Sequence, residues 1–213
     1  MDISYLGHSS FKIRTKKATV VTDPYSLEKG GLKFPRIEAD IVTISHPRKD
    51  QRFLEGIVGQ PFIVAQPGEY EVKGISFFAY PSFHRERTEA PKILNTIFLI
   101  EADGMTICHL GGLEGTLSTK IMEEIIGADI LMVPVGGIDT LGPKEAVEIV
   151  NQIEPKIVLP MHFRMAGTNE ELAELSEFLA EMGAEQAEKM DKLSISKDKL
   201  PGETKVIVLE RKD

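Results

Sequence analysis

The sequence predicts an α/β fold, in which sheets and flanking helices share one core over a single domain of residues 1–213. Two patterns indicate this fold. The first half consists mostly of short apolar or alternating segments typical of strands, and the second half alternates such segments with amphipathic helices. The 213 residues are 42% hydrophobic and 27% charged, which suits a globular domain and excludes disordered, collagen-like and coiled-coil proteins.

Strands dominate the first half of the chain. Gly7-His8-Ser9 supplies a turn, and Asp103-Gly104 favours the tight hairpin turn that needs positive φ. Pro24 ends the third strand because proline cannot donate a hydrogen bond to a neighbouring strand. The predicted strands are Asp2–Leu6, Phe11–Arg14, Thr19–Thr22, Asp40–Ser45, Phe62–Ala65, Glu69–Val72, Ile75–Tyr80, Asn95–Ala102 and Met105–Leu110.

Helices enter in the second half. A serine N-cap, a proline at a first helical position and a run of leucines at helical spacing each indicate one helix. Gly183 supplies the stop of the last of these helices. The predicted helices are Ser118–Ile126, Pro143–Ile153 and Asn169–Met182, and the predicted strands are Asp129–Val133, Lys156–Leu159 and Lys205–Leu209.

The charge and the cysteine content limit the partners and the location. Thirty-three acidic against 25 basic residues give a net charge of −8, which opposes binding to nucleic acid or to an anionic membrane. The apolar segment 130–135 is far shorter than the roughly 18 residues of a membrane span. The first residues lack the features of a signal peptide, and Cys108 is the single cysteine. We therefore expect a cytoplasmic protein that binds neither nucleic acid nor membrane.

Three of the five histidines follow predicted strands. His46, His84 and His162 come after the strands that end near Ser45, Tyr80 and Leu159. Ligands gather at the carboxyl ends of strands in layered folds, where loops carry side chains on a rigid base. A single histidine in such a place is commonly an ordinary polar loop residue, so the pattern leaves both a metal site and a set of unrelated loop histidines open.

The order of short motifs along the chain resembles the metallo-β-lactamase superfamily, and within it the small bacterial and archaeal branch akin to ascorbate-phosphate lactonases. The resemblance implies a four-layered αββα sandwich with two metal ions, usually zinc, at one edge, where they activate a hydroxide for hydrolysis. The motifs that carry it are Leu6-Gly7-His8-Ser9-Ser10-Phe11, Thr22-Asp23-Pro24, residues 40–50, Pro67-Gly68-Glu69-Tyr70, Asn95-Thr96, Asp103-Gly104, His109-Leu110-Gly111, Pro134-Val135-Gly136-Gly137 and Pro160-Met161-His162-Phe163.

The resemblance implies ligand positions that this chain fills only in part. The family pattern His-x-His-x-Asp-His corresponds to residues 46–51, His46-Pro47-Arg48-Lys49-Asp50-Gln51, and the carboxylate that bridges both metals corresponds to Gly112. Arginine stays protonated and cannot bind a cation, glutamine is a poor zinc ligand, and glycine offers no side chain. The retained candidate ligands are His46, Asp50, His84 and His162, and the substituted positions are Arg48, Gln51 and Gly112.

We therefore predict no dinuclear zinc centre. One weakly bound metal on the four retained ligands stays open. The simpler interpretation is an ion pair, and we expect the Arg48 guanidinium to lie within hydrogen-bond reach of Asp50 in place of the metal. His8 and His109 are expected to make hydrogen bonds in the core or around the site. The sequence favours Cys108 as a buried, inert thiol, because its strand neighbour His109 points to the opposite face.

Two classes of function follow from this site. The first is a metal-dependent hydrolase of an ester, lactone or phosphoester, with His46, Asp50, His84 and His162 as ligands, Asp50 also serving the chemistry, and metal-activated water as the nucleophile. The second is a catalytically silent relative that binds a small molecule or a partner protein, since one fold supports many functions. The substrate is open in both classes, and self-association is compatible with either.

Overall fold

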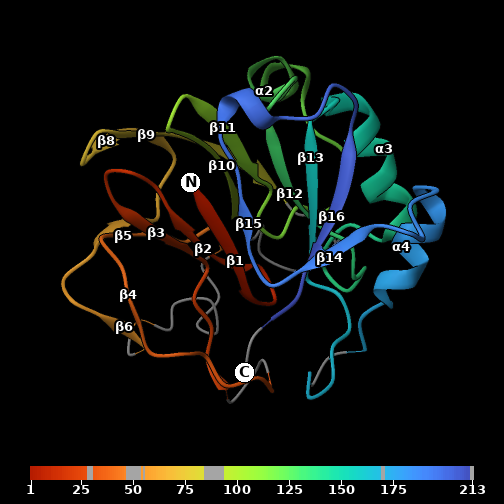
Figure 1. The fold of residues 1–213 in the computed structure, drawn as a ribbon, viewed down its shortest axis with the longest axis horizontal. Coiled ribbons are helices and arrows are strands. Elements are labelled where there is room, and N and C mark those ends of the chain that lie inside the picture. The colour runs from red at the N-terminus through yellow and green to blue at the C-terminus, as the bar shows by residue number, and fades with distance from the viewer. Residues whose placement is uncertain (28–30, 47–53, 55, 84–93, 169–170, 212–213) are drawn as a thin grey trace.

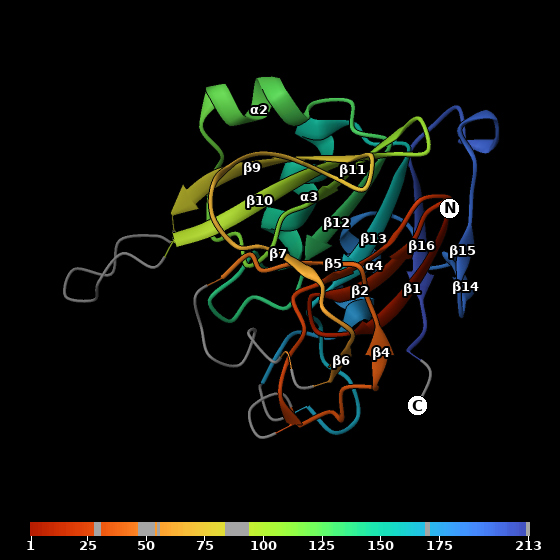
Figure 2. The same cartoon turned by 90° about the vertical axis from the view of Figure 1, so that its left-hand side faces the viewer.

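The computed structural model describes residues 1–27, 31–46, 54, 56–83, 94–168 and 171–211. Two sheets pack face to face (Figures 1 and 2). The first has six strands in the order β15-β1-β2-β3-β5-β7, antiparallel from β15 to β3 and parallel from β3 to β7. Its strands are β1 (Asp2–Gly7), β2 (Ser10–Arg14), β3 (Thr19–Thr22), β5 (Ile41–Thr43), β7 (Phe62–Val64) and β15 (Leu193–Ser194).

The second sheet has eight strands in the order β14-β16-β13-β12-β11-β10-β9-β8. The five strands from β14 to β11 are parallel, and those from β11 to β8 are antiparallel. Asp103 and Gly104, both at positive φ, form the two-residue hairpin turn that the sequence predicts. The strands are β8 (Gly68–Val72), β9 (Ile75–Phe83), β10 (Leu94–Ala102), β11 (Met105–His109), β12 (Ile130–Pro134), β13 (Ile157–Met161), β14 (Glu188–Met190) and β16 (Lys205–Leu209).

An outer layer covers each sheet. Helices α2 (Thr119–Ile125), α3 (Pro143–Ile153) and α4 (Leu175–Glu181) lie on the outer face of the eight-stranded sheet (Figure 1). On the six-stranded sheet, Val20 and Ile41 belong to the core between the sheets, whereas Val21 and Val42 belong to a second cluster with Tyr25, Leu32 and Phe34. Alternate residues of a strand face opposite sides, so this second cluster forms the outer layer, together with β4 (Ile37–Glu38) and β6 (Ile57–Val58). The four-layered α/β sandwich is confirmed.

The prediction of a helix over residues 169–182 is wrong for residues 171–174, since α4 begins only at Leu175, and residues 169–170 lie outside the described residues. The Ala173 amide donates to the Gly136 carbonyl, and the Ala173 carbonyl accepts from the Arg164 amide. The neighbouring Leu172 is buried, with its side chain against Gly136. In this segment the backbone of Ala173 makes hydrogen bonds to distant residues instead of helical ones. These tertiary bonds override the helical propensity that the leucine spacing indicates.

The remaining predicted elements agree with the structure to within a few residues. Helix α3 begins at Pro143 as predicted, and Ser118 accepts a hydrogen bond from the Ile121 amide as the N-cap of α2. The sequence missed β4, β6, β14, β15 and the 3₁₀ helix Lys197–Lys199. Each of these elements has two or three residues, which is too short to carry a periodic signal.

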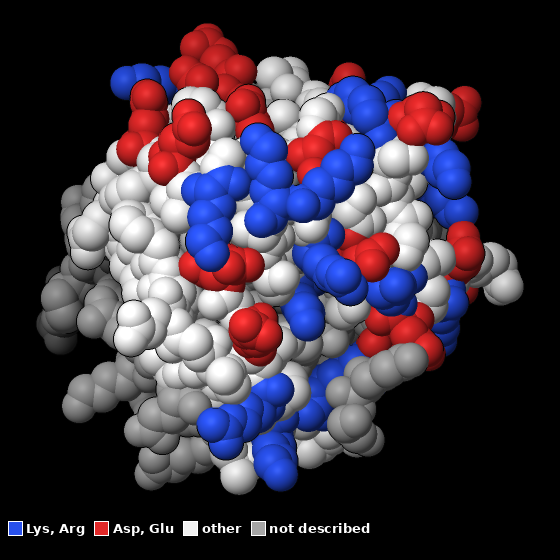
Figure 3. All heavy atoms as spheres, turned by 60° about the vertical axis from the view of Figure 1, so that its left-hand side comes forward, with Lys and Arg blue, Asp and Glu red and all other residues white. Residues whose placement is uncertain are grey.

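Basic and acidic side chains are interspersed over the face of the molecule in Figure 3. Opposite charges in this arrangement limit the local field that a polyanion would meet. Among the residues that the structure describes, no helix combines the length and the apolar character needed to cross a membrane.

Candidate metal site

The candidate site lies where the loops after β5, β11 and β13 meet the turn between β1 and β2. His46, Gly112 and His162 belong to the described residues. Four predicted positions lie outside the described residues, so the expected Arg48–Asp50 ion pair and the full ligand set stay predictions. These positions are Arg48, Asp50, Gln51 and His84.

Asp23 fixes the segment that carries His46. The Asp23 carboxylate accepts a hydrogen bond from the Ser45 amide at 2.6 Å and another from the Ser45 hydroxyl at 2.5 Å. The Ser45 carbonyl in turn accepts from the Thr96 amide of β10 at 2.7 Å, which ties the two sheets together. His46 follows directly and is 2% exposed. Because its neighbour is held from both sides, the backbone leaves little freedom to the position of the His46 imidazole.

His109 lies beneath this segment, fully buried, with Nδ1 3.9 Å from the Asp23 carboxylate. Its Nε2 lies 2.8 Å from the Ser9 carbonyl, and its Nδ1 accepts from the Gly111 amide at 3.2 Å. A carbonyl only accepts and an amide only donates, so these bonds assign the proton to Nε2 and a neutral imidazole. Burial lowers the pKa of His109 and raises the pKa of Asp23, and the attraction between the two groups opposes both shifts.

Two adjacent glycines differ sharply in the space around them. A Cβ at Gly111, where φ is +60°, would clash with Asn95 Oδ1 and lie 2.5 Å from Ser45 Cβ. A Cβ at Gly112 would make ordinary contacts, 3.8 Å from His46 Cδ2, and Gly112 lacks the positive φ that strains a side chain. The Gly112 amide donates to Asn95 Oδ1 at 2.9 Å. Gly112, which the resemblance predicts at the position of the bridging carboxylate, therefore lies beside His46 and has room for a side chain.

His162 is placed mainly by its backbone and by aromatic packing. Its amide donates to the His8 carbonyl at 2.8 Å, and the Tyr5 hydroxyl donates to the same oxygen at 2.8 Å. The rings of His8 and His162 are 6.0 Å apart between centroids, and Phe163 stacks on Tyr5 at 5.8 Å. His162 thus follows β13 with its neighbour anchored in the core.

Three residues of this edge have left-handed backbones although they are not glycine. They are His8, Asp23 and His162, with φ of 49°, 37° and 52°. Such conformations are unfavourable for most side chains, and they concentrate at functional sites, where the surrounding structure enforces them. All three lie where the two sheets meet, and this clustering supports a functional site at this edge.

No three histidine, cysteine, aspartate or glutamate side chains come together as a metal-binding group within the described part of the chain. The described donors that the sequence predicts, the imidazoles of His46 and His162, are of the type that zinc prefers. With Asp50 and His84 the donor set would number four, which fits a single zinc ion. Gly112 has no side chain that could bridge a second ion, so the absence of a dinuclear centre stays a prediction.

Comparison with known proteins decides the family. A β-lactamase superfamily domain model matches residues 2–162. The chain belongs to the metallo-β-lactamase superfamily. A Thermotoga maritima structure assigned to the Zn-dependent hydrolases of this superfamily is 31% identical, covers 99% of each chain and superposes with a TM-score of 0.82. A metal-dependent hydrolase of the UPF0173 group from Thermococcus onnurineus is 27% identical over 76% of this chain and 84% of its own length. A metallo hydrolase from Ignicoccus hospitalis shares the fold at 20% identity and a TM-score of 0.65.

The sequence reasoning assigned no role to Asp23, Ser45 or Asn95, although all three lie in or beside its motifs. Their function depends on partners from distant segments, since Asp23 holds Ser45 and Asn95 holds Gly112. A usable signal was a polar residue that directly follows a buried strand, as Asp23 does after Thr22. His109 is buried and hydrogen-bonded as expected, and burial raises the pKa of the Cys108 thiol, which suits an inert residue.

Proposed function

We propose that the protein is a hydrolase with one metal ion, held by His46, Asp50, His84 and His162, that cleaves an ester, lactone or phosphoester. The observation that carries the proposal is the proximity of Gly112 to His46, since a Cβ added at Gly112 would lie 3.8 Å from His46 Cδ2. A candidate ligand is kept in place at the end of β5, while the position beside it offers no carboxylate for a second ion. Membership of a superfamily whose relatives include metal-dependent hydrolases supports the reaction class.

When bound, a zinc ion supplies a Lewis acid and lowers the pKa of water toward neutrality. The chain's own residues prepare the site for this chemistry. Asp23 and Ser45 fix the backbone that leads to His46, and the left-handed backbone of His162 bends the chain directly after β13. Asp50 would complete the ligand set with a carboxylate, whose charge offsets that of the metal. Preorganisation of His46 would reduce the rearrangement needed when metal arrives.

A silent binding scaffold is the alternative, and the substituted positions Arg48, Gln51 and Gly112 favour it. A guanidinium at a ligand position repels a cation at short range and can itself pair with Asp50. In that case the carboxylate would be neutralised by Arg48, and the edge would bind a small molecule or a partner protein without metal. The two functions differ in one measurable quantity, the number of metal ions bound by each chain.

Metal analysis of protein purified without chelator separates the two. The hydrolase proposal expects one zinc ion per chain, weakened at least about tenfold by His46→Ala or His162→Ala, as loss of a zinc ligand should. The scaffold alternative expects no bound metal, unchanged by either substitution. Two tightly held ions per chain that survive dialysis would refute both.

Rebuilding the missing ligands tests the assignment of positions. We expect the variant Arg48→His, Gln51→His, Gly112→Asp to bind two zinc ions and each single change to add none, because neighbours in one site act together. Gly112→Asp is sterically acceptable, since its Cβ meets only ordinary contacts. A folded triple variant that binds no second zinc would show that residues 46–51 do not occupy the family's ligand positions.

A further inference from the structure

A second concave site lies behind the His162 loop, at the side where β1, β14 and β16 approach one another. It is a cavity of about 400 Å³. Its deepest walls are the buried side chains of Tyr5, Leu32, Phe163, Val208 and Leu209. Met165, Ala166 and Leu175 continue the wall from the loop after β13 to the start of α4. Binding pockets for small molecules have this size and this predominantly apolar lining.

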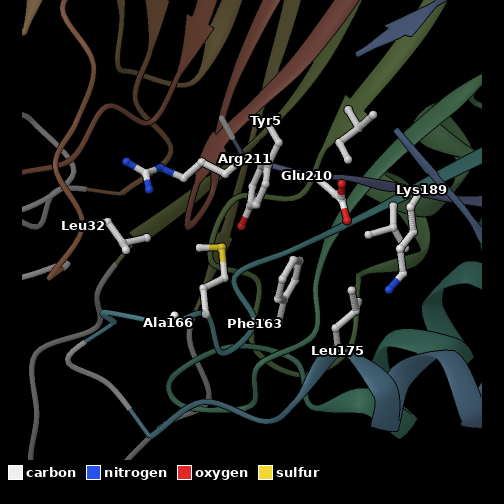
Figure 4. Close-up of a pocket in the computed structure, with 11 residues that line it drawn as sticks. Tyr5, Leu32, Phe163, Ala166, Leu175, Lys189, Glu210 and Arg211 are labelled. Atoms are coloured by element: carbon white, nitrogen blue, oxygen red, sulfur yellow. The ribbon is translucent and has the colours of Figure 1, made fainter. Parts of the chain in front are cut away.

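Three charged side chains line the cavity. Arg211 already makes hydrogen bonds within the protein, and Lys189 and Glu210 lie at the mouth. Arg211 donates from Nε to the Leu6 carbonyl at 3.2 Å and from Nη2 to the Lys33 carbonyl at 2.7 Å. Figure 4 shows its guanidinium on the side of Leu32, while the exposed Lys189 and Glu210 lie together at the opposite side. Lys189 and Glu210 carry opposite charges, so together they give the mouth no net charge.

Two aromatic side chains, Tyr5 and Phe163, contribute to the buried wall of the cavity. The Tyr5 and Phe163 rings are stacked with an interplanar angle of 29°, and Figure 4 shows both side chains, with Leu175, around the same space. The Tyr5 hydroxyl already donates to the His8 carbonyl, so the ring rather than the hydroxyl is available. Aromatic walls favour a flat aromatic or branched aliphatic body, and burial of apolar area drives its binding.

We propose that this cavity binds an uncharged small molecule with an aromatic or branched aliphatic body, separately from the candidate metal site. The apolar walls select the body, and the charges of Lys189 and Glu210 offset each other. Arg211 keeps its charge, but its guanidinium is engaged by the Leu6 and Lys33 carbonyls on the side of Leu32, so it is not aimed at the apolar body. A free cation or anion would lose hydration on entry without a matched buried partner, which costs affinity. The inference does not depend on the proposed hydrolase activity, because none of the lining residues is a candidate ligand.

Three matched probes test the proposal: naphthylmethanol, naphthoate and naphthylmethylammonium. The chain has no tryptophan, so naphthyl fluorescence can be followed without overlapping indole emission. We expect saturable binding of one naphthylmethanol per chain, at least about fivefold tighter than either ion. Tighter binding of one of the ions would overturn the assignment of an uncharged ligand, and the absence of saturable binding would overturn the site.

Substitutions in the wall locate the probe. Ala166→Phe fills part of the cavity and Leu175→Asn makes its wall polar, and we expect each to weaken naphthylmethanol binding about tenfold. Ala180→Phe, at an exposed position of α4, is the matched control and should bind as the parent does. Thermal melting checks that each variant folds. If both wall variants bind naphthylmethanol as the parent does, the probe lies elsewhere and the proposal fails.

The mouth charges provide a second, finer test. Glu210→Gln leaves Lys189 unbalanced and should shift the preference several-fold toward naphthoate, and Lys189→Gln should shift it toward naphthylmethylammonium. Repeating the titration with excess zinc distinguishes this cavity from the metal site. Binding that zinc leaves unchanged supports the proposal, whereas competitive loss of naphthylmethanol would place the probe among the candidate ligands and overturn it.

Discussion

The two described histidines of the candidate site are held in different ways. The segment of His46 is fixed by a buried polar network, in which Asp23 binds Ser45 and both lie next to the neutral His109. The loop of His162 is fixed by a left-handed backbone, a main-chain hydrogen bond to His8 and the packing of Phe163 on Tyr5. The β5 side should therefore respond to changes of polarity and pH, and the β13 side to changes of backbone conformation and packing.

The largest effect is expected from Gly111, which packs against the β5 side. Gly111→Ala introduces a Cβ into Asn95 and Ser45 at a left-handed position, and we expect it to lower the free energy of unfolding by about 3 kcal/mol. Gly112→Ala is the matched control next to it and should cost less than about 1 kcal/mol. Urea denaturation measures both. Equal losses for the two variants would mean that the network does not depend on close packing at Gly111.

Asp23→Asn should have the next largest effect. The amide oxygen still accepts from the Ser45 amide, but the new NH2 group faces the Ser45 hydroxyl, which must then accept, so the hydroxyl proton loses its carboxylate acceptor. We expect a loss of about 2 kcal/mol in the free energy of unfolding. Asparagine tolerates the left-handed backbone at this position, so the loss reports the network and not strain. Glu203→Gln, at an exposed carboxylate, is the control and should leave the urea midpoint unchanged. An Asp23→Asn variant as stable as the parent would show that the β5 side does not depend on this polar network.

On the β13 side, comparing His162→Ala with His162→Gly separates the effect of the left-handed backbone from the effect of losing the imidazole. Both changes remove the imidazole, but only glycine adopts φ near 52° without strain. We expect His162→Gly to be more stable than His162→Ala by about 1 kcal/mol, while both lose zinc affinity equally. Thermal melting and zinc titration give the two quantities. A more stable alanine variant would show that the left-handed backbone is not a determinant of this loop.

The smallest effect is a pH dependence that belongs to the β5 side. Burial lowers the pKa of His109, so below about pH 6.5 the unfolded chain takes up a proton that the folded chain refuses. Stability should fall as pH falls through this window, by at most about 1.4 kcal/mol per pH unit. The raised pKa of Asp23 acts in the opposite sense, because the folded state then holds the proton more tightly.

His109→Gln tests the source of that dependence. The variant is expected to be less stable at neutral pH, because a fully buried imidazole loses its bonds to Ser9 and Gly111. Its loss of stability between pH 6.5 and 5.5 should be smaller than that of the parent, as followed by urea denaturation at each pH. A steeper dependence in the variant would assign the titration to another group.

The fold was largely predictable because its elements carry local signals. Helix α3 has a proline at its start and one apolar face, and the strands on both sides of Asp103-Gly104 pair through a turn that their own sequence specifies. The start of α4 was not predictable, since the hydrogen bonds of Ala173 to Gly136 and Arg164 come from other parts of the chain. Local spacing cannot register a competing tertiary partner.

By itself, the sequence determined the superfamily, the four layers and the positions of His46 and His162 after strands, because motif order and apolar periodicity are properties of the chain. The resemblance also predicts that Arg48, Gln51 and Gly112 stand at ligand positions of the family, and residue type alone says that none of them is a good zinc ligand. Only the tertiary structure decided that Gly112 has room for a side chain and Gly111 has none, and that Asp23 serves Ser45. Those facts depend on distances between segments far apart in the chain, and such distances are set by how the two sheets pack.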